Sequence, residues 1–158
     1  MSDTYKLAKR FKRKYPLTVA WRLRSHCKVI DMHLNKSEGE EILYLFMGQK
    51  NENPFDFVNT NVIVLTNKRI MVATKRIVFG YFFISITPEM YNDLTIKKGL
   101  LWGTVIIDTI KENCYFTNID PKALPEIETN ITEIMARVQK ECEVPIRRNK
   151  AMTKSIES

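Results

Sequence analysis

Apolar side chains recur at helical spacing in the first 34 residues of the chain. Over residues 4–15 they gather on one side of a helix and cations surround them, which predicts a short basic amphipathic helix ended by Pro16. Over residues 17–34 the apolar positions step by four, four, three and four residues, which predicts a second helix with one buried face. This second stripe consists of Val19, Leu23, Cys27, Ile30 and Leu34, with Trp21 lying off it.

Beyond residue 41 the pattern changes to short runs of apolar and β-branched residues separated by polar turns. Seven runs at this spacing are typical of an antiparallel sandwich or barrel. Asn67 and Lys68 are expected to form a hairpin turn, because Asn tolerates a positive φ. The expected strands are residues 42–47, 62–66, 69–74, 79–87, 93–96, 101–110 and 113–119.

The last patterned element is helical again. Asp120 suits the N-cap of a helix and Pro121 suits its first position. The apolar stripe that follows predicts one buried face, which we expect to plug the open end of a strongly bent sheet. The sequence thus predicts an α+β fold, a split barrel of about seven antiparallel strands with a C-terminal capping helix and a two-helix N-terminal extension. The residues of the last stripe are Ile127, Ile131, Ile134, Val138 and Cys142.

We expect three parts: a basic helical extension over residues 1–38, the barrel over residues 39–143, and a mobile polar tail over residues 144–158. The barrel would be complete without residues 1–36, because its own last helix supplies the plug. The charge is uneven along these parts. Residues 1–36 have a net charge of +8, residues 37–143 of −4 and residues 144–158 of +3, within a total of +7. An acidic core with basic ends argues against a nucleic-acid-binding face on the barrel.

Length and composition limit the class of protein. The 158 residues, 44% of them hydrophobic, suit one globular domain. No apolar run reaches the roughly 18 residues that a membrane span needs, and the N-terminus lacks the pattern of a secretory signal. We therefore expect a cytoplasmic protein. Three widely spaced cysteines form no C-x-x-C pair, so they are interpreted as buried thiols.

Signals of catalysis are weak. His26 and His33 lie seven residues apart, two helical turns, which is poor spacing for a shared metal ion. The sequence has no glycine-rich phosphate loop, no nucleophile elbow and no His-Glu-x-x-His motif. We expect no enzyme activity, no metal and no small-molecule cofactor.

Two segments carry a family resemblance. The stretch Leu65-Thr66-Asn67-Lys68-Arg69-Ile70 and the stretch from Ile96 through Lys97-Lys98-Gly99 to Gly103 resemble the signatures of bacterial PH-like domains of the YokE-like group. The resemblance covers about residues 40–142 and implies a PH-like split barrel that binds or assembles without catalysis. Members of this family, some of them encoded in prophages, often have no assigned activity.

Eukaryotic relatives of the fold often bind phosphoinositide headgroups around the first hairpin loop. Here that loop, residues 49–60, contains Lys50 against Glu52 and Asp56, which argues against such a ligand. The leading hypothesis is a protein partner, or self-association, through the N-terminal helices. The residues expected to carry it are Val19, Trp21, Leu23, Ile30 and Leu34.

The basic first helix suggests two alternatives. Its cations could hold the protein on an anionic membrane at the inner face of the cell membrane, or they could bind nucleic-acid phosphates. A docked, solvated helix explains the same pattern. The candidate anion-binding residues are Lys6, Lys9, Arg10, Lys12, Arg13 and Lys14.

Overall fold

The computed structural model describes residues 2–50 and 59–157, and the side chains of residues 2–50 and 59–142. Two helices, α1 (Asp3–Lys14) and α2 (Leu23–His33), and a 3-10 turn, η1 (Lys36–Glu38), precede the strands. The strands are β1 (Ile42–Gln49), β2 (Thr60–Thr66), β3 (Ile70–Lys75), β4 (Tyr81–Ile86), β5 (Tyr91–Lys98), β6 (Gly103–Thr109) and β7 (Asn113–Ile119). A second 3-10 turn, η2 (Pro121–Ala123), leads into α3 (Leu124–Glu157).

The seven strands form one antiparallel sheet in the order β4-β3-β2-β1-β7-β6-β5. Strands β1 to β4 pair in sequence, and so do β5 to β7, while the two halves meet where Gln49 of β1 lies opposite Thr117 of β7. The turn between β2 and β3 falls at Asn67 and Lys68, as predicted, with Leu65 opposite Ile70. The seven strands and the α+β architecture are confirmed.

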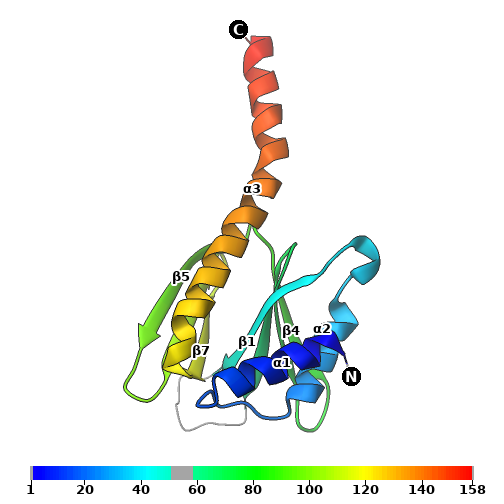
Figure 1. Ribbon diagram of the computed structural model, residues 1–158. Coiled ribbons are helices and arrows are strands. Elements are labelled where there is room, and N and C mark those ends of the chain that lie inside the picture. The colour runs from blue at the N-terminus through cyan, green and yellow to red at the C-terminus, as the bar shows by residue number, and fades with distance from the viewer. Residues whose placement is uncertain (1, 51–58, 158) are drawn as a thin grey trace.

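Helix α3 covers one side of the bent sheet, where Figure 1 shows it running past β7 and β5. Four of the five residues of its predicted stripe are buried: Ile127 and Ile131 have no exposed surface, and Ile134 and Val138 have almost none. The fifth, Cys142, is only partly buried, whereas the other two thiols, of Cys27 and Cys114, are buried as predicted. The Gln139 amide donates hydrogen bonds of 3.0 Å to the carbonyls of Pro88 and Tyr91, which ties α3 to β5. The plug that the apolar stripe predicts is therefore present.

The two N-terminal helices cover another part of the sheet. All seven residues of β2 are buried, because α2 packs against β2 and β3 on the side away from the barrel interior. Phe11 of α1 and Cys27 and Ile30 of α2 belong to the same hydrophobic core as the strands. All seven strands and the capping helix lie beyond residue 36, whereas residues 1–36 cover an apolar face of the sheet. The expectation that the barrel is complete without residues 1–36 stays a prediction.

The second helix is shorter than its apolar pattern predicts, because it begins at Leu23 and not near residue 17. Residues 17–22 bond to strand ends instead. The backbone N–H of Val19 donates to the Asn118 carbonyl, and the Val19 carbonyl accepts a hydrogen bond from the side-chain amide of Gln49. Arg22 then takes a left-handed conformation, with φ of 53°. Pro16 and the β-branched Thr18 and Val19 disfavour a helix here, and tertiary bonds satisfy the backbone in its place.

The last helix continues through the expected tail to Glu157. The side chains beyond residue 142 lie outside the described part of the chain, and the mobility of residues 144–158 stays a prediction.

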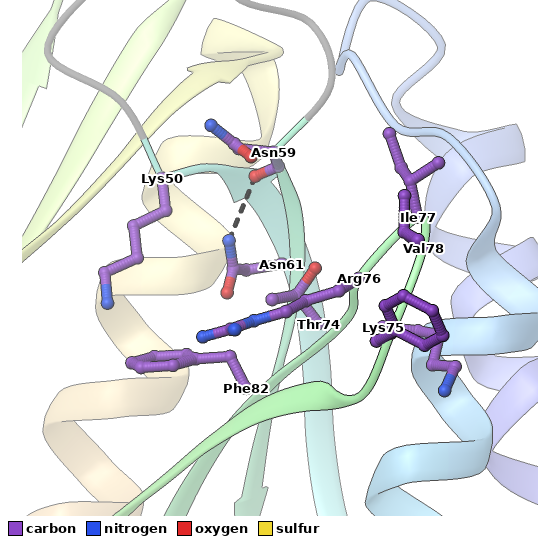
Figure 2. Close-up of a pocket in the computed structure, with 10 residues that line it drawn as sticks. Lys50, Asn59, Asn61, Thr74, Lys75, Arg76, Ile77, Val78 and Phe82 are labelled. Atoms are coloured by element: carbon purple, nitrogen blue, oxygen red, sulfur yellow. Dashed lines mark hydrogen bonds between the residues drawn. The ribbon is translucent and has the colours of Figure 1, made fainter.

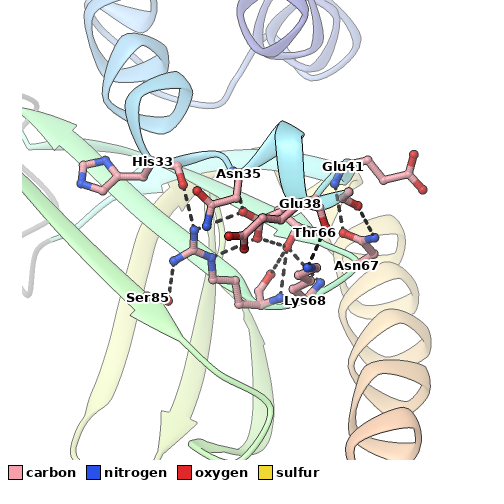
Figure 3. Close-up of polar contacts among 11 residues, drawn as sticks. His33, Asn35, Glu38, Glu41, Thr66, Asn67, Lys68 and Ser85 are labelled. Atoms are coloured by element: carbon pink, nitrogen blue, oxygen red, sulfur yellow. Dashed lines mark hydrogen bonds and ion pairs between the residues drawn. The ribbon is translucent and has the colours of Figure 1, made fainter.

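The segment between α2 and β1 is held by the turn that carries the family-like motif (Figure 3). Arg69 donates to both carboxylate oxygens of Glu40, at 3.0 and 3.1 Å, and to the carbonyl of His33 at 2.9 Å. Thr66 donates to the same carboxylate at 2.8 Å. Burial acts to raise the pKa of Glu40, but the hydrogen bonds from Arg69 and its other donors outweigh it and hold the pKa below its usual value. This network holds the segment before β1 and the end of α2 against the β2–β3 turn.

Candidate functional site

A pocket of about 640 Å³ lies where β1 ends, β2 begins and the β3–β4 hairpin turns (Figure 2). Ten described residues line it: Lys50, Asn59, Asn61, Thr74, Lys75, Arg76, Ile77, Val78, Phe79 and Phe82. Three of them are cations and none is acidic. A pocket with this lining favours an anionic occupant.

The cations come from two separate elements. Lys50 follows β1, and its ammonium group lies 4.1 Å from the centroid of the Phe82 ring on β4, within the range of a cation–π contact. Lys75 ends β3, and Arg76 starts the turn, where its N–H donates to the Gly80 carbonyl at 3.1 Å. In Figure 2 the side chains of Lys50 and Arg76 both extend toward the space above Phe82. The two strands thus bring separated charges to one pocket.

A buried amide also lines the pocket. Asn61 on β2 is 1% exposed, and its amide nitrogen donates to the Asn59 carbonyl at 3.0 Å. The side-chain oxygen of Asn61 is buried and has no hydrogen-bond partner among the described residues. Burying an unpaired polar atom is costly, so this oxygen favours a donor from a ligand or from water.

Helix α2 holds the hairpin that carries Lys75 and Arg76. The Nδ1 atom of His26 accepts a hydrogen bond of 2.7 Å from the backbone N–H of Lys75, and Arg22 donates to the Lys75 carbonyl at 3.3 Å. Burial lowers the pKa of His26 to about 4, so the imidazole is neutral near pH 7 and can act as this acceptor.

Comparison with known families adds to this geometry. The family model of the bacterial PH domain matches residues 37–133, which includes all seven strands and the start of α3. The chain belongs to the bacterial PH domain family. No curated protein matches the chain. PH-like domains are typically binding modules, and the pocket lies wholly inside the matched part of this bacterial PH domain. The narrower likeness to the YokE-like group stays a prediction.

The cations predicted on α1, which precedes the part of the chain that matches the bacterial PH domain, divide into two groups. Lys12 donates to the carbonyls of Pro16 and Thr18, and Lys14 forms an ion pair of 2.6 Å with Glu126 on α3. Lys9 lies 5.3 Å from the ring centroid of Tyr5, and Lys6 pairs with Asp3. Arg10 and Arg13 are exposed. The six cations of α1 are therefore not equally available to bind an anionic surface.

The residues predicted for a partner-binding helix also separate. Ile30 is fully buried, and Leu23 and Leu34 pack against the core, so these three residues already pack within the chain. Val19 and Trp21 are not helical, since both precede α2. Trp21 is exposed; its backbone N–H donates to the Thr60 hydroxyl at 3.0 Å.

The two histidines, both on α2, pack against different parts of the sheet. His26 faces the end of β3, while the ring of His33 stacks on Phe83 of β4 with centroids 3.8 Å apart. Within the described residues no group of three His, Cys, Asp or Glu side chains is placed to hold a metal ion. No helix in the described part of the chain is long and apolar enough to pass through a lipid bilayer.

Sequence reasoning missed Lys50, Lys75 and Arg76. The predicted strand 79–87 placed Phe79 inside a strand, whereas the structure puts it in the hairpin turn with Gly80 at a φ of 72°. A sequence pattern could have pointed to Lys75 and Arg76: two adjacent cations precede a short apolar run that ends in glycine, Lys75-Arg76-Ile77-Val78-Phe79-Gly80. The acidity expected of the loop 49–60 depends on Glu52 and Asp56, which lie outside the described residues.

Proposed function

We propose that this bacterial PH domain is a non-catalytic module that binds a phosphate-bearing ligand in the pocket between β1 and the β3–β4 hairpin. The observation that carries the proposal is that Lys50 and Arg76 both extend into a pocket whose described lining contains no carboxylate, while Lys75 lines the pocket with its ammonium group turned toward α2 (Figure 2). Lysine and arginine are the residues that proteins commonly use to bind phosphate groups, because each donates charge-assisted hydrogen bonds.

The buried amide narrows the chemistry of the ligand. The unpaired oxygen of Asn61 needs a hydrogen-bond donor, which the dianionic phosphate group of a phosphate monoester does not supply. A hydroxyl group close to the phosphate supplies it. We therefore propose a phosphorylated polyol or sugar, and the volume of about 640 Å³ is within the range of small-molecule sites.

Calorimetric titration of the full chain with inorganic phosphate and with phosphorylated polyols tests this function. We expect the polyols to bind more tightly than phosphate alone. Lys50→Gln and Arg76→Gln should each weaken binding about tenfold or more, because a hydrogen bond to a charged group contributes about 1.5–3 kcal/mol. Lys111→Gln is the matched control, since Lys111 is an exposed cation in the turn between β6 and β7.

Two results would contradict the proposal: no measurable binding of any phosphorylated compound, or equal losses in Lys111→Gln and the pocket variants. Asn61→Asp adds a third check. A carboxylate at this position should repel the ligand and abolish binding, provided that the thermal unfolding of the variant stays cooperative.

A protein partner is the second candidate. The exposed Arg10 and Arg13 on α1 favour an acidic protein segment, whereas the buried apolar faces of α1 and α2 disfavour self-association through those faces. Replacing both arginines by Gln should then weaken capture of that partner and leave polyol phosphate binding unchanged. Binding of α1 to an anionic membrane or to nucleic acid, a cytoplasmic location, and the division at residues 38 and 143 are retained as proposals on the sequence alone.

A further inference from the structure

Large apolar side chains are exposed in three segments at one end of the molecule. These segments, called here the loop edge, are residues 17–22, 75–80 and 97–102. They contain seven of the twelve exposed large hydrophobic residues of the described chain. Phe79 is 83% exposed and Leu100 is fully exposed. The seven residues are Leu17, Trp21, Ile77, Val78, Phe79, Leu100 and Leu101.

The three segments are bonded to one another. The indole N–H of Trp102 donates to the Leu17 carbonyl at 2.9 Å, which joins the β5–β6 turn to residues 17–22. At the other end of that link, Arg22 donates to the Lys75 carbonyl and joins it to the β3–β4 hairpin. In Figure 1 the two hairpin turns and the link between α1 and α2 all lie along the lower border of the molecule. The three segments that contain the apolar residues therefore lie at one border of the molecule.

The charge of the loop edge has one sign. Its eighteen residues contain five cations, Arg22, Lys75, Arg76, Lys97 and Lys98, and no carboxylate. The nearby carboxylate of Asp120 is buried and bonded to the backbone N–H groups of Leu17 and Lys122. Glu126, at the start of α3, is paired with Lys14. The described surface around the tips is thus basic.

We propose that the loop edge docks on an anionic lipid bilayer, with Trp21, Phe79 and Leu100 inserted among the headgroups and the five cations facing lipid phosphates. Separate apolar tips on basic loops suit a soft interface better than the flat surface of a protein partner. A second copy of the chain would bring the same cations face to face, so charge disfavours self-association at this edge. Trp is also a side chain that proteins place at the level of lipid headgroups.

This docking surface goes beyond the phosphate pocket. Trp21, Leu100 and Leu101 do not line the pocket, and residues 17–22 lie outside the part of the chain that matches the family. Residues 75–79 belong to both surfaces, so the test uses Leu100 and Leu101, which belong to the loop edge alone.

Vesicle binding of the full chain is the test. The probe is a vesicle of phosphatidylcholine with phosphatidylglycerol, compared with phosphatidylcholine alone. Paired substitution of Leu100 and Leu101 by Ser should lower partitioning by about tenfold or more, because two apolar side chains lose their burial. Ile110→Ser is the matched control, since Ile110 is 63% exposed in the β6–β7 turn, outside the loop edge.

Tryptophan fluorescence gives an independent readout, because the chain has two tryptophans. The emission of the wild-type chain should shift to shorter wavelength on anionic vesicles and be quenched by brominated lipid chains. A Trp21→Phe variant, which keeps the bond from Trp102 to Leu17, should lose the part of this change that Trp21 contributes. Raising the salt from 0.1 to 1 M shortens the Debye length from about 10 to about 3 Å and should weaken binding.

Four results would overturn the proposal. They are a failure of the wild-type chain to bind anionic vesicles at low salt, equal binding by the Leu100 and Leu101 variant, an equal loss in Ile110→Ser, and no change in Trp21 emission on bound vesicles. Variants that bind soluble polyol phosphate normally but no longer bind vesicles would separate this surface from the pocket.

Discussion

The imidazole of His26 and the backbone N–H of Lys75 form a hydrogen bond of 2.7 Å that joins α2 to the β3–β4 hairpin. His26 lies outside the part of the chain that matches the family, whereas Lys75 lies inside it and lines the pocket. A residue of the N-terminal extension thus positions the backbone from which two of the pocket cations, Lys75 and Arg76, project. The extension and the pocket are parts of one structure.

The buried His26 makes stability depend on pH. Its pKa is about 4 in the folded chain, because burial disfavours the charged ring, and about 6.5 when it is free. Between these values the unfolded chain binds a proton that the folded chain does not, so the free energy of unfolding should fall as the pH falls. The slope should reach up to about 1.4 kcal/mol for each pH unit.

Urea denaturation between pH 7 and pH 4.5 measures this slope. His26→Asn is the informative variant, because an amide oxygen can accept the Lys75 hydrogen bond but does not titrate. We expect its slope to be nearly flat. Glu40 and Glu126 add a loss of stability of their own only as the pH approaches 4.5, because hydrogen bonds from Arg69 and Lys14 respectively outweigh burial and hold both folded-state pKa values below the ordinary 4.5. The slopes of the two proteins are therefore compared above about pH 5.5. An unchanged slope in His26→Asn would assign the pH dependence to other groups.

Arg69 neutralises a carboxylate that is almost fully buried, since the Glu40 side chain is 1% exposed. Arg69→Met leaves this charge without its partner and should lower the free energy of unfolding by about 3–5 kcal/mol. Adding Glu40→Gln to Arg69→Met removes the buried charge and should recover part of the loss. Lys68→Met, at the exposed neighbour, should change stability by no more than about 0.5 kcal/mol. A double variant no more stable than Arg69→Met would show that the buried charge is not the cause.

Periodicity predicted the elements of this fold because each has one face in a shared core. The stripe from Ile127 to Val138 and the turn at Asn67 depend on local spacing and local turn chemistry, and both are where the pattern places them. The start of α2 is not where the pattern places it. Val19 bonds to Asn118 and Gln49, which lie about 100 and 30 residues away in the sequence, and these bonds replace the first turns of the helix. A local pattern contains no information about such partners.

The candidate site was harder to predict for the same reason. Lys50 and Arg76 are 26 residues apart in sequence, and only the pairing of four strands brings them to one pocket. The net charge of −4 over residues 37–143 concealed this local cluster of cations, since an average over a domain hides how charge is placed on its surface. The sequence instead predicted anion binding at helix α1, because the cations of α1 are close together in the sequence.

Gly103, the last residue of the second family-like stretch, packs directly beneath Leu124 at the start of α3. A Cβ atom added to Gly103 would lie 2.8 Å from the Leu124 Cγ atom, well inside contact distance. Gly103→Ala should therefore lower the free energy of unfolding by about 1–3 kcal/mol. The loss should be smaller when Gly103→Ala is made in a Leu124→Ala background, and equal losses in both backgrounds would show that crowding at Leu124 is not the cause. Thermal or urea unfolding of the four variants measures both quantities.

Removal of residues 1–36 should expose the outer face of β2 and β3, which α2 covers. We expect the 37–158 fragment to aggregate or to bind hydrophobic dyes, although it contains the whole segment that matches the family. Size-exclusion chromatography with light scattering, run beside the full chain, measures this directly. A monomeric 37–158 fragment with the unfolding temperature of the full chain would show that the helices are dispensable.

A pair of substitutions on α2 separates loss of packing from the other effects of truncation. Ile30 is fully buried against the sheet, whereas Met32, two residues further on the same helix, is 65% exposed. Ile30→Ala should lower the free energy of unfolding by about 2–5 kcal/mol, because it leaves a cavity between helix and sheet. Met32→Ala should cost no more than about 0.5 kcal/mol, since Ala has a helix propensity at least as high and little packing is lost. Similar urea midpoints for the two variants would mean that α2 contributes little to the core, and the aggregation of the fragment would then need another explanation.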